Sequence, residues 1–205
     1  MVRRARAEYL FDGCYAHVIS RSIRKLKILR DREDFERFID IIRKEKARRG
    51  FKVFHYCFMQ THFHMALQME DVKAFSMAML TVKSRYSYLF HEKYRMNGPI
   101  WRERYKSLLI EDEGYLQACG EYIENNPVKA GLVEDASDWP YSSARYYYEG
   151  KEDVLMDKVE RKRKQANVDI FLDEEEFFER GSVIGSAFYR FQFYKGFKKQ
   201  GDLSL

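Results

Sequence analysis

Residues 51–69, FKVFHYCFMQTHFHMALQM, predict two neighbouring strands around which the rest of the chain is organised. The first run is rich in aromatic residues, Thr61 is placed to turn the chain, and the second run carries His62 and His64. Because side chains alternate between the faces of a strand, both histidines point to the same face, about 6–7 Å apart. Phe63 then points to the other face, toward a core. Two imidazoles on one rigid element can bind a metal ion, although paired surface histidines on a strand usually have no such role.

Strands and helices alternate on both sides of this pair, as hydrophobic periodicity and turn residues indicate. Asp31 or Asp34 is placed to cap the first helix, and Gly50 to end it. The expected elements are a strand at 15–21, a helix at 35–49, strands at 51–60 and 62–69, a helix from 72 to the break at 97–99, a strand at 101–110 and a helix at about 112–126. This order, βαββαβ, predicts an α+β fold with a ferredoxin-like antiparallel sheet and helices on one face, followed by one further helix.

The composition suits a folded protein of one domain with an appendage, or of two small domains. Of 205 residues, 45% are hydrophobic and 16% aromatic, enough for a packed core. The composition changes after residue 148, where a highly charged run at 152–165 precedes an aromatic-rich segment at 177–197. We therefore expect a first domain at 1–148 and a C-terminal extension at 149–205, whose role the sequence does not define.

Charge and cysteine content indicate an intracellular protein. The net charge is +5, a mild excess that favours an anionic partner only where the basic residues cluster. Cys14, Cys57 and Cys119 have no short metal-ligand spacing and are interpreted as reduced thiols. No stretch approaches the roughly 20 apolar residues of a transmembrane helix, and no signal peptide is apparent. A soluble cytoplasmic protein without a membrane partner is expected.

The last predicted helix offers two polar side chains that complement the histidine pair. Tyr122 and Asn126 are four residues apart, so on a helix they are neighbours on one face. A phenol and an amide oxygen there can face a metal held by His62 and His64. Each residue also has an ordinary interpretation, Tyr122 as a packing tyrosine and Asn126 as a helix-end residue before Pro127. His17, in the first strand, is interpreted as a partly buried histidine.

These segments together carry a resemblance. The run from His62 to His64 resembles the histidine–hydrophobic–histidine (HUH) motif of single-strand DNA endonucleases. Residues 122–133, YIENNPVKAGLV, resemble the tyrosine helix of REP-associated tyrosine transposases, relatives of the bacterial single-tyrosine transposases. Three more segments fit in order: the basic arm leading into 16–21, the segment 101–107, and WPYSS at 139–143. The likeness spans roughly residues 1–148. One departure is Ser22, where relatives often have glycine.

The resemblance implies a metal-dependent endonuclease or transposase that cleaves and rejoins single-stranded DNA at hairpin-forming repeats (REP elements). Tyr122 is then the catalytic nucleophile that forms a 5′-phosphotyrosine. His62, His64 and Asn126 are then the ligands of Mg²⁺ or Mn²⁺. The partner is single-stranded or hairpin DNA in the nucleoid, and the family implies a homodimer or a monomer. The expected DNA-binding residues are Arg3, Arg4, Arg6, Arg21, Arg24, Lys25, Arg102, Arg104 and Lys106. Trp101 and Tyr105 are candidates to stack on unpaired bases, with core packing an equal alternative for Trp101.

Two other functions compete with this hypothesis. A non-catalytic nucleic-acid-binding protein can use the same sheet, with aromatics such as Phe54 and Tyr56 stacking on bases. A metal-dependent hydrolase can use water as its nucleophile. Both predict that Tyr122→Phe retains function, whereas the transposase hypothesis predicts that this variant binds DNA but does not cleave it.

Overall fold

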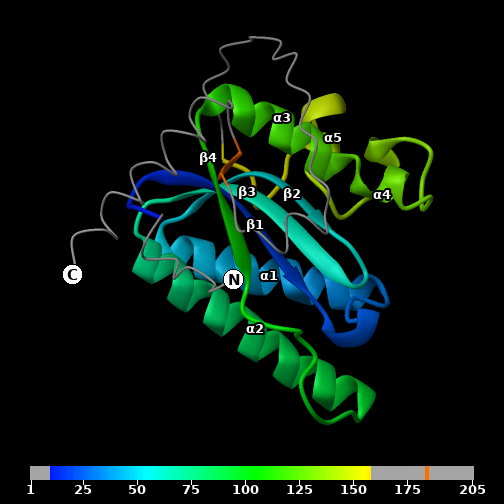
Figure 1. Cartoon of the computed structure of the whole chain (residues 1–205). Coiled ribbons are helices and arrows are strands. Elements are labelled where there is room, and N and C mark those ends of the chain that lie inside the picture. The colour runs from blue at the N-terminus through cyan, green and yellow to red at the C-terminus, as the bar shows by residue number, and fades with distance from the viewer. Residues whose placement is uncertain (1–9, 158–182, 185–205) are drawn as a thin grey trace, which may run out of the picture.

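A four-stranded antiparallel sheet lies at the centre of the computed structural model, which describes residues 10–157 and 183–184 (Figure 1). A short strand at the end of the described chain, β5, extends the sheet by pairing parallel to β4. The strand order is β2-β3-β1-β4-β5. The strands are β1 (Cys14–Arg21), β2 (Lys52–Phe58), β3 (His62–Met69), β4 (Lys106–Ile110) and β5 (Val183–Ile184).

Helices cover both faces of this sheet. The two long helices α1 and α2 lie against one face, and α3 lies against the other together with α5 (Figure 1). The helices are α1 (Arg32–Arg49), α2 (Val72–Tyr94), α3 (Glu113–Glu124), α4 (Asn126–Lys129) and α5 (Ala144–Tyr148), with 3-10 turns η2 (Ile23–Lys25) and η3 (Ala136–Asp138). The predicted ferredoxin-like α+β fold, with a tyrosine-bearing helix added, is confirmed.

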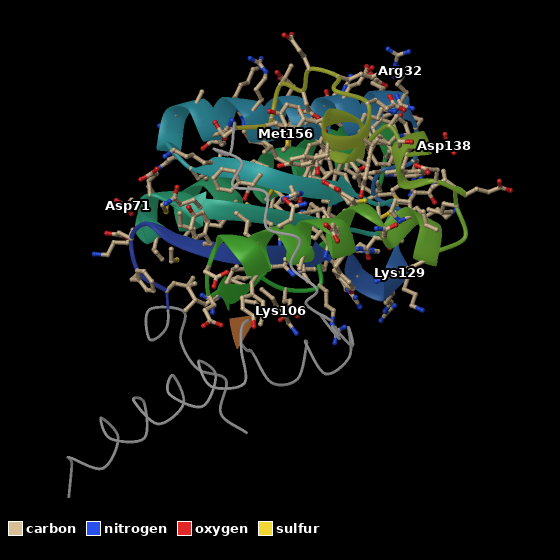
Figure 2. All side chains as sticks on the ribbon, turned by 90° about the horizontal axis from the view of Figure 1, so that it is seen from above. Arg32, Asp71, Lys106, Lys129, Asp138 and Met156 are labelled. Carbon is tan, nitrogen blue, oxygen red and sulfur yellow. The ribbon has the colours of Figure 1, made fainter. Side chains whose placement is uncertain are left out.

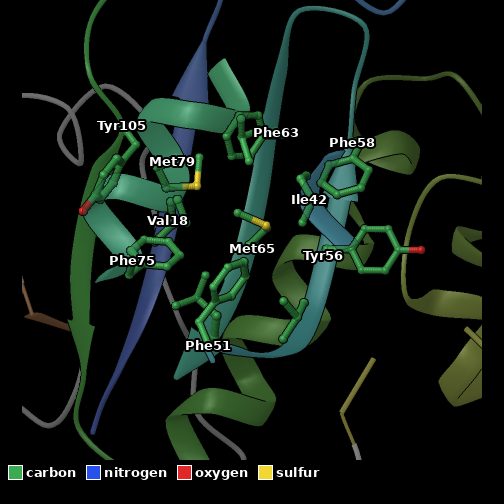
Figure 3. Packing of buried hydrophobic residues seen from close by; sticks show 14 of the residues in the cluster. Val18, Ile42, Phe51, Tyr56, Phe58, Phe63, Met65, Phe75, Met79 and Tyr105 are labelled. Atoms are coloured by element: carbon green, nitrogen blue, oxygen red, sulfur yellow. The ribbon is translucent and has the colours of Figure 1, made fainter. Parts of the chain in front are cut away.

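Strand alternation divides the sheet residues between two cores. Phe63 is almost fully buried against α1 and α2, beside Met65 of the same strand and Val18 of β1 (Figure 3). The neighbouring positions on β3 face α3, where a smaller apolar cluster includes Cys119 and Ile123. His62 and His64 therefore share the face that α3 covers, as the alternation in the sequence predicts.

Local sequence explains where the long helices begin and end. Asp31 is the N-cap of α1, since its carboxylate accepts a hydrogen bond from the backbone N–H of Asp34 at 3.0 Å. Asp71 caps α2 in the same way through Ala74. Gly50 follows α1 with a φ of 72°, a left-handed conformation that glycine adopts without steric cost.

Two of the predicted boundaries that differ from the structure have a clear physical cause. The strand expected at 101–110 contains only Lys106–Ile110, because Trp101 forms a single bridge to Ser22 and turns its ring into the core against Phe63. The helix expected to continue to residue 126 ends at Glu124, and Asn126 opens the separate turn α4. Pro127 causes this break, because it has no N–H to continue the helical hydrogen bonds.

The serine that replaces the family's common glycine does not strain the loop after β1. Ser22 has a φ of −71° and a ψ of 160°, an extended conformation open to any residue. The left-handed positions are instead Arg24 and Lys25, with φ of 48° and 55°. The loop is held by hydrogen bonds from Ser22 N to the Thr61 carbonyl and from Ile23 N to the Ile100 carbonyl. The basic turn thus lies beside the start of β3.

The chain just beyond residue 148 packs on the same core. Asp157 exchanges two hydrogen bonds of 2.8 Å with the backbone of Val53, and its carboxylate also pairs with Lys46. Leu155 is fully buried, and Asp153 accepts a hydrogen bond from the Tyr56 hydroxyl at 2.5 Å. Most of the proposed extension at 149–205, including residues 158–165 of its charged run, lies outside the described residues.

Two further findings concern cysteines and membrane spans. The three cysteines are buried free thiols, and burial raises the pKa of each. Within the described residues, every helix is too short or too polar to cross a bilayer.

Candidate active site

His62 and His64 lie side by side on the face of β3 that α3 covers. Their ring centroids are 5.0 Å apart and the ring planes are nearly perpendicular, at 83°. His62 is half-buried and its Nδ1 shares a hydrogen bond of 3.0 Å with the hydroxyl of Thr61. His64 is fully buried, and its Nε2 has no hydrogen-bond partner in the described part of the chain. A buried nitrogen of this kind is available to bind a ligand.

A third histidine, His17 of β1, lies directly behind His64. It is fully buried, and its Nε2 shares a hydrogen bond of 3.0 Å with Nδ1 of His64. The two rings are stacked, with centroids 5.2 Å apart and planes inclined by 30°. His17 was predicted to be a partly buried histidine. It is fully buried, and its contact with His64 was not predicted.

All three imidazoles are neutral at pH 7. Burial lowers the pKa of His17 to about 3. Burial, assisted by the charge of Arg21, lowers the pKa of His62 to about 4. For His64, burial again lowers the pKa well below its ordinary value, and the nearby positive charges of Arg21 and Lys129 act in the same direction. Neutral imidazoles keep the lone pairs that a metal ion requires.

Helix α3 places Tyr122 over these histidines. Its apolar side, with Leu116, Cys119 and Ile123, packs on the second core and leaves Tyr122 half-buried at the edge of the site. The centroid of the Tyr122 ring is 6.4 Å from the His64 ring and 6.4 Å from the His17 ring. The structure therefore brings the predicted nucleophile and the histidine pair together within one chain.

Lys129 of α4 completes the surroundings of Tyr122. Its ammonium lies 3.9 Å from the centroid of the Tyr122 ring, within the range of a cation–π contact. Burial lowers the pKa of this lysine. Figure 2 shows Lys129 and Lys106 along one edge of the molecule, opposite the edge that carries Arg32.

A buried polar cluster attaches α3 to the sheet. His55 Nδ1 of β2 lies 2.9 Å from a carboxylate oxygen of Glu124, and the hydroxyl of Ser143 donates to the same oxygen at 2.6 Å. The His55 ring stacks on Tyr147, with centroids 4.6 Å apart. Gly120 lies against this ring so closely that an added Cβ would be 2.2 Å from His55 Nδ1. The cluster sets how closely the helix that carries Tyr122 approaches the sheet.

Asn126 has a structural role at the helix break. Its side-chain N–H groups donate to the carbonyls of Tyr122 at 2.9 Å and Ile123 at 3.1 Å. In an uninterrupted helix the Ile123 carbonyl would accept from residue 127, which is proline and has no N–H. The amide of Asn126 replaces that donor. With its nitrogen bound to this backbone, the amide has one remaining group, the oxygen Oδ1, which is an acceptor.

The donor set fits a divalent cation. His62 and His64 are neutral, adjacent and on a rigid strand, and Nε2 of His64 is buried without a hydrogen-bond partner in the described chain. No group of three His, Cys, Asp or Glu side chains suited to a metal occurs in the described ranges. A third protein ligand must then be of another type, such as the amide oxygen of Asn126. Whether Asn126 is that ligand stays a prediction.

The predicted DNA-binding residues fall into three groups. Arg21 lies opposite His62 in the register between β1 and β3, so it borders the histidine pair. The turn residues Arg24 and Lys25 and the segment residues Arg102 and Arg104 are exposed, and Lys106 pairs with Glu103 at 3.4 Å. Arg3, Arg4 and Arg6 lie outside the described residues.

The aromatic side chains considered for base stacking are mostly engaged in packing. Phe54, Tyr56 and Tyr105 are each 5% exposed or less. The hydroxyl of Tyr105 is hydrogen-bonded to Ser76 at 2.9 Å, so the prediction that Tyr105 stacks on bases is wrong. Trp101 is half-buried and donates its indole N–H to the Lys83 carbonyl. Phe54 and Tyr56 are too deeply buried to stack on bases, so they cannot support the alternative binding function.

Comparison with known proteins identifies the family of the chain. The chain belongs to the family described as "Transposase IS200 like", whose model matches residues 11–126. A Haemophilus influenzae protein that bears the name REP-associated tyrosine transposase is 32% identical over 104 residues. The match covers 45% of this chain and 58% of that relative's length.

Solved structures resemble the chain as well. The structure of a REP-associated tyrosine transposase bound to a REP hairpin gives a TM-score of 0.61 at 22% identity, covering 80% of this chain and 96% of that one. A transposase from Deinococcus radiodurans gives a TM-score of 0.39 at 20% identity, covering 60% of this chain and 97% of that one. The first likeness confirms the fold.

Proposed function

We propose that this protein is a transposase that cleaves and rejoins single-stranded DNA through Tyr122. The observation that carries the proposal is the position of the Tyr122 ring, 6.4 Å from the buried His64 ring of the same chain. A packing tyrosine has no need of two neutral, buried histidines at its ring. Membership of the IS200-like family supports the same activity. Because Tyr122 lies beside its own chain's histidines, we further propose that one chain suffices to form the site.

His62, His64 and the Oδ1 of Asn126 would hold Mg²⁺ or Mn²⁺. When bound, the cation would neutralise charge on the scissile phosphate and help to orient it. The protein's own contribution is to keep two ligands neutral through burial and to fix them on β3. The break at Pro127 places Asn126 just beyond the end of α3, where its nitrogen is bound to backbone and its oxygen is left for a ligand.

The chemical step is a transesterification. The phenolic oxygen of Tyr122 attacks the phosphorus, a bond forms between them, and the bond from phosphorus to the 3′ oxygen breaks. The phenol gives up its proton, and the departing 3′ oxygen takes up a proton to become a hydroxyl group. The product is a 5′-phosphotyrosine. The covalent bond retains the energy of the phosphodiester, so the reverse reaction rejoins DNA without a nucleotide cofactor.

Lys129 would assist Tyr122 electrostatically. A phenol with a pKa near 10 is a weak nucleophile at neutral pH. The ammonium 3.9 Å from the ring centroid stabilises negative charge that develops on the phenolic oxygen. Lys129 also offers a positive charge to the phosphate.

The substrate would be hairpin-forming DNA with an adjacent single strand, and the site of action the nucleoid in the cytoplasm. The structural relative that is bound to a REP hairpin supports this class of substrate. The exposed basic residues Arg24, Lys25, Arg102 and Arg104 lie on the two segments that meet at Ser22 and Trp101. They are suited to contact phosphates next to the histidine site.

The test is the formation of a covalent adduct. The protein is incubated with Mn²⁺ and labelled hairpins that represent the palindromic repeats of its host genome. We expect a labelled band that survives denaturation, disappears in EDTA and is absent from Tyr122→Phe. The matched control is Tyr115→Phe, a second tyrosine of α3, which should retain the band. Binding of Tyr122→Phe to the hairpin, measured by gel shift, should match wild type. An adduct that forms equally in Tyr122→Phe would refute the proposal.

A further inference from the structure

The buried contact between His17 and His64 has two arrangements with different chemical consequences. Each imidazole is neutral and carries one N–H, and one hydrogen lies in the 3.0 Å contact. If His64 Nδ1–H donates to His17 Nε2, the Nε2 of His64 keeps its lone pair and can bind a cation. If His17 Nε2–H donates instead, the Nε2 of His64 carries a hydrogen and cannot be a ligand. The direction of the hydrogen bond to His17 therefore determines whether Nε2 of His64 can bind a cation.

We propose that His17 is a positioning residue that accepts the Nδ1–H of His64 and thereby presents the Nε2 lone pair of His64 to the active site. This inference rests on the proposed function, because it assigns a purpose to that lone pair. His17 touches neither the substrate nor the cation, and it acts only through His64.

The surroundings of the pair strengthen its hydrogen bond. His17 is opposite Ala66 of β3 and Leu108 of β4, and His64 is opposite Ile19 of β1 and Cys57 of β2. In such an apolar environment a hydrogen bond is electrostatically stronger than in water. The buried contact with His17 is sufficient to fix the orientation of the His64 ring.

Nearby charges distinguish the two histidines. Arg21 and Lys129 act electrostatically on His64, whereas burial alone accounts for the lowered pKa of His17. These positive charges disfavour a second proton on His64, so that the ring keeps one nitrogen with a free lone pair. Nε2 is the nitrogen without a hydrogen-bond partner in the described residues. Donation from Nδ1 of His64 to His17 leaves the lone pair on that nitrogen.

Ligand histidines generally depend on such partners, because a hydrogen bond to the second ring nitrogen fixes the tautomer and the ring orientation. Here the partner is a neutral imidazole in place of a carboxylate or carbonyl group. A neutral partner keeps the net charge of the site low, so that it does not repel the phosphate of an incoming DNA strand.

Two variants of matched size test this role in the full chain. The side chain introduced by His17→Gln retains an acceptor near the position of the imidazole Nε2, whereas that of His17→Met has a similar length and lacks a strong acceptor. Leu108→Val, a core change opposite His17, is the control for packing alone. Circular dichroism and thermal unfolding first establish which variants are folded.

The first readout is independent of activity. Long-range ¹H–¹⁵N correlation spectra of the metal-free protein report which His64 nitrogen carries the hydrogen. We expect Nδ1–H in wild type, Leu108→Val and His17→Gln, and a shift toward Nε2–H in His17→Met. A wild-type protein with the hydrogen on Nε2 would overturn the inference, and so would an unchanged tautomer in His17→Met.

The second readout is Mn²⁺ affinity, measured by electron paramagnetic resonance titration. His17→Met should bind Mn²⁺ about 10–100-fold more weakly than wild type, as is typical when such a partner is lost. His17→Gln should remain within about threefold. If wild type binds no Mn²⁺, the proposed metal dependence fails, and the role of His17 fails with it. If wild type binds and His17→Met binds equally well, only the role of His17 fails.

Discussion

Replacing Gly120 with alanine should displace the helix that carries Tyr122. The added Cβ would lie 2.2 Å from His55 Nδ1, about 1.2 Å closer than the 3.4 Å at which ordinary van der Waals contact begins. The ring cannot simply move away, because Glu124 binds its Nδ1 at 2.9 Å and Tyr147 stacks on its face. Either α3 shifts outward or the buried hydrogen bond breaks.

The expected loss of stability is about 3 kcal/mol, at the upper end of the range for overpacking a core. This loss exceeds the gain of up to about 1 kcal/mol that alanine gives over glycine within a helix. Urea unfolding followed by circular dichroism measures the difference, with free energies obtained by linear extrapolation. Adduct formation should fall as well, since Tyr122 is two residues along the same helix.

Two variants give this prediction its controls. Gly114→Ala, also on α3, meets only the Asp112 carboxylate at 3.2 Å and should change the free energy of unfolding by less than about 1 kcal/mol. In a His55→Ala background, Gly120→Ala should cost much less than it does alone, because the ring it meets is gone. A Gly120→Ala protein as stable as wild type would refute the packing described here.

Three other changes have defined outcomes. In EDTA, the free energy of unfolding should fall as the pH drops from about 6.5 toward 4, because the unfolded chain binds protons at His17 and His62 that the folded state excludes. His62 alone should contribute about 3 kcal/mol to this loss. Urea titration at each pH measures it, and a free energy of unfolding that does not change with pH would contradict the expectation. Leu155→Ala should destabilise the protein by about 3 kcal/mol, because this fully buried leucine joins the segment after α5 to the core; an unchanged urea midpoint would exclude that packing. Lys129→Met should slow adduct formation about tenfold, and Lys129→Arg should slow it less because it keeps the positive charge. Equal single-turnover rates in the wild type and both variants would exclude Lys129 from the mechanism.

Much of the fold follows from short-range patterns. The alternation at His62, Phe63 and His64 correctly predicted which side chains face the core, because a strand has a fixed period of two. Asp31 and Gly50 marked the two ends of the first long helix for equally local reasons. The fourth strand was predicted too long, since Trp101 is drawn into the core by contacts that are distant in sequence.

The site was only partly predictable. Tyr122 was placed beside the histidines from a resemblance, and the structure brings them together. Pro127 was expected to stop the helix at Asn126, but α3 ends at Glu124. The helical spacing did not anticipate that the side-chain nitrogen of Asn126 would bind backbone carbonyls.

Contacts between distant segments were not anticipated either. His17 and His64 are 47 residues apart, and His55 and Glu124 are 69 apart. A single sequence contains no local signal for such pairs. The period-two pattern of β1 does place His17 and Arg21 on one face, but the strand order is needed to show that this face adjoins His64.

The most direct test of the central claim is to locate the nucleotide on the protein. After reaction with a hairpin substrate and Mn²⁺, the adduct is digested with nuclease and trypsin, and the peptides are analysed by mass spectrometry. The tryptic peptide 107–129 contains both Tyr115 and Tyr122, so fragmentation distinguishes the two tyrosines. We predict a phosphodeoxynucleotide on Tyr122 alone. Its attachment to any other residue, or cleavage of the hairpin without a covalent peptide, would contradict the account.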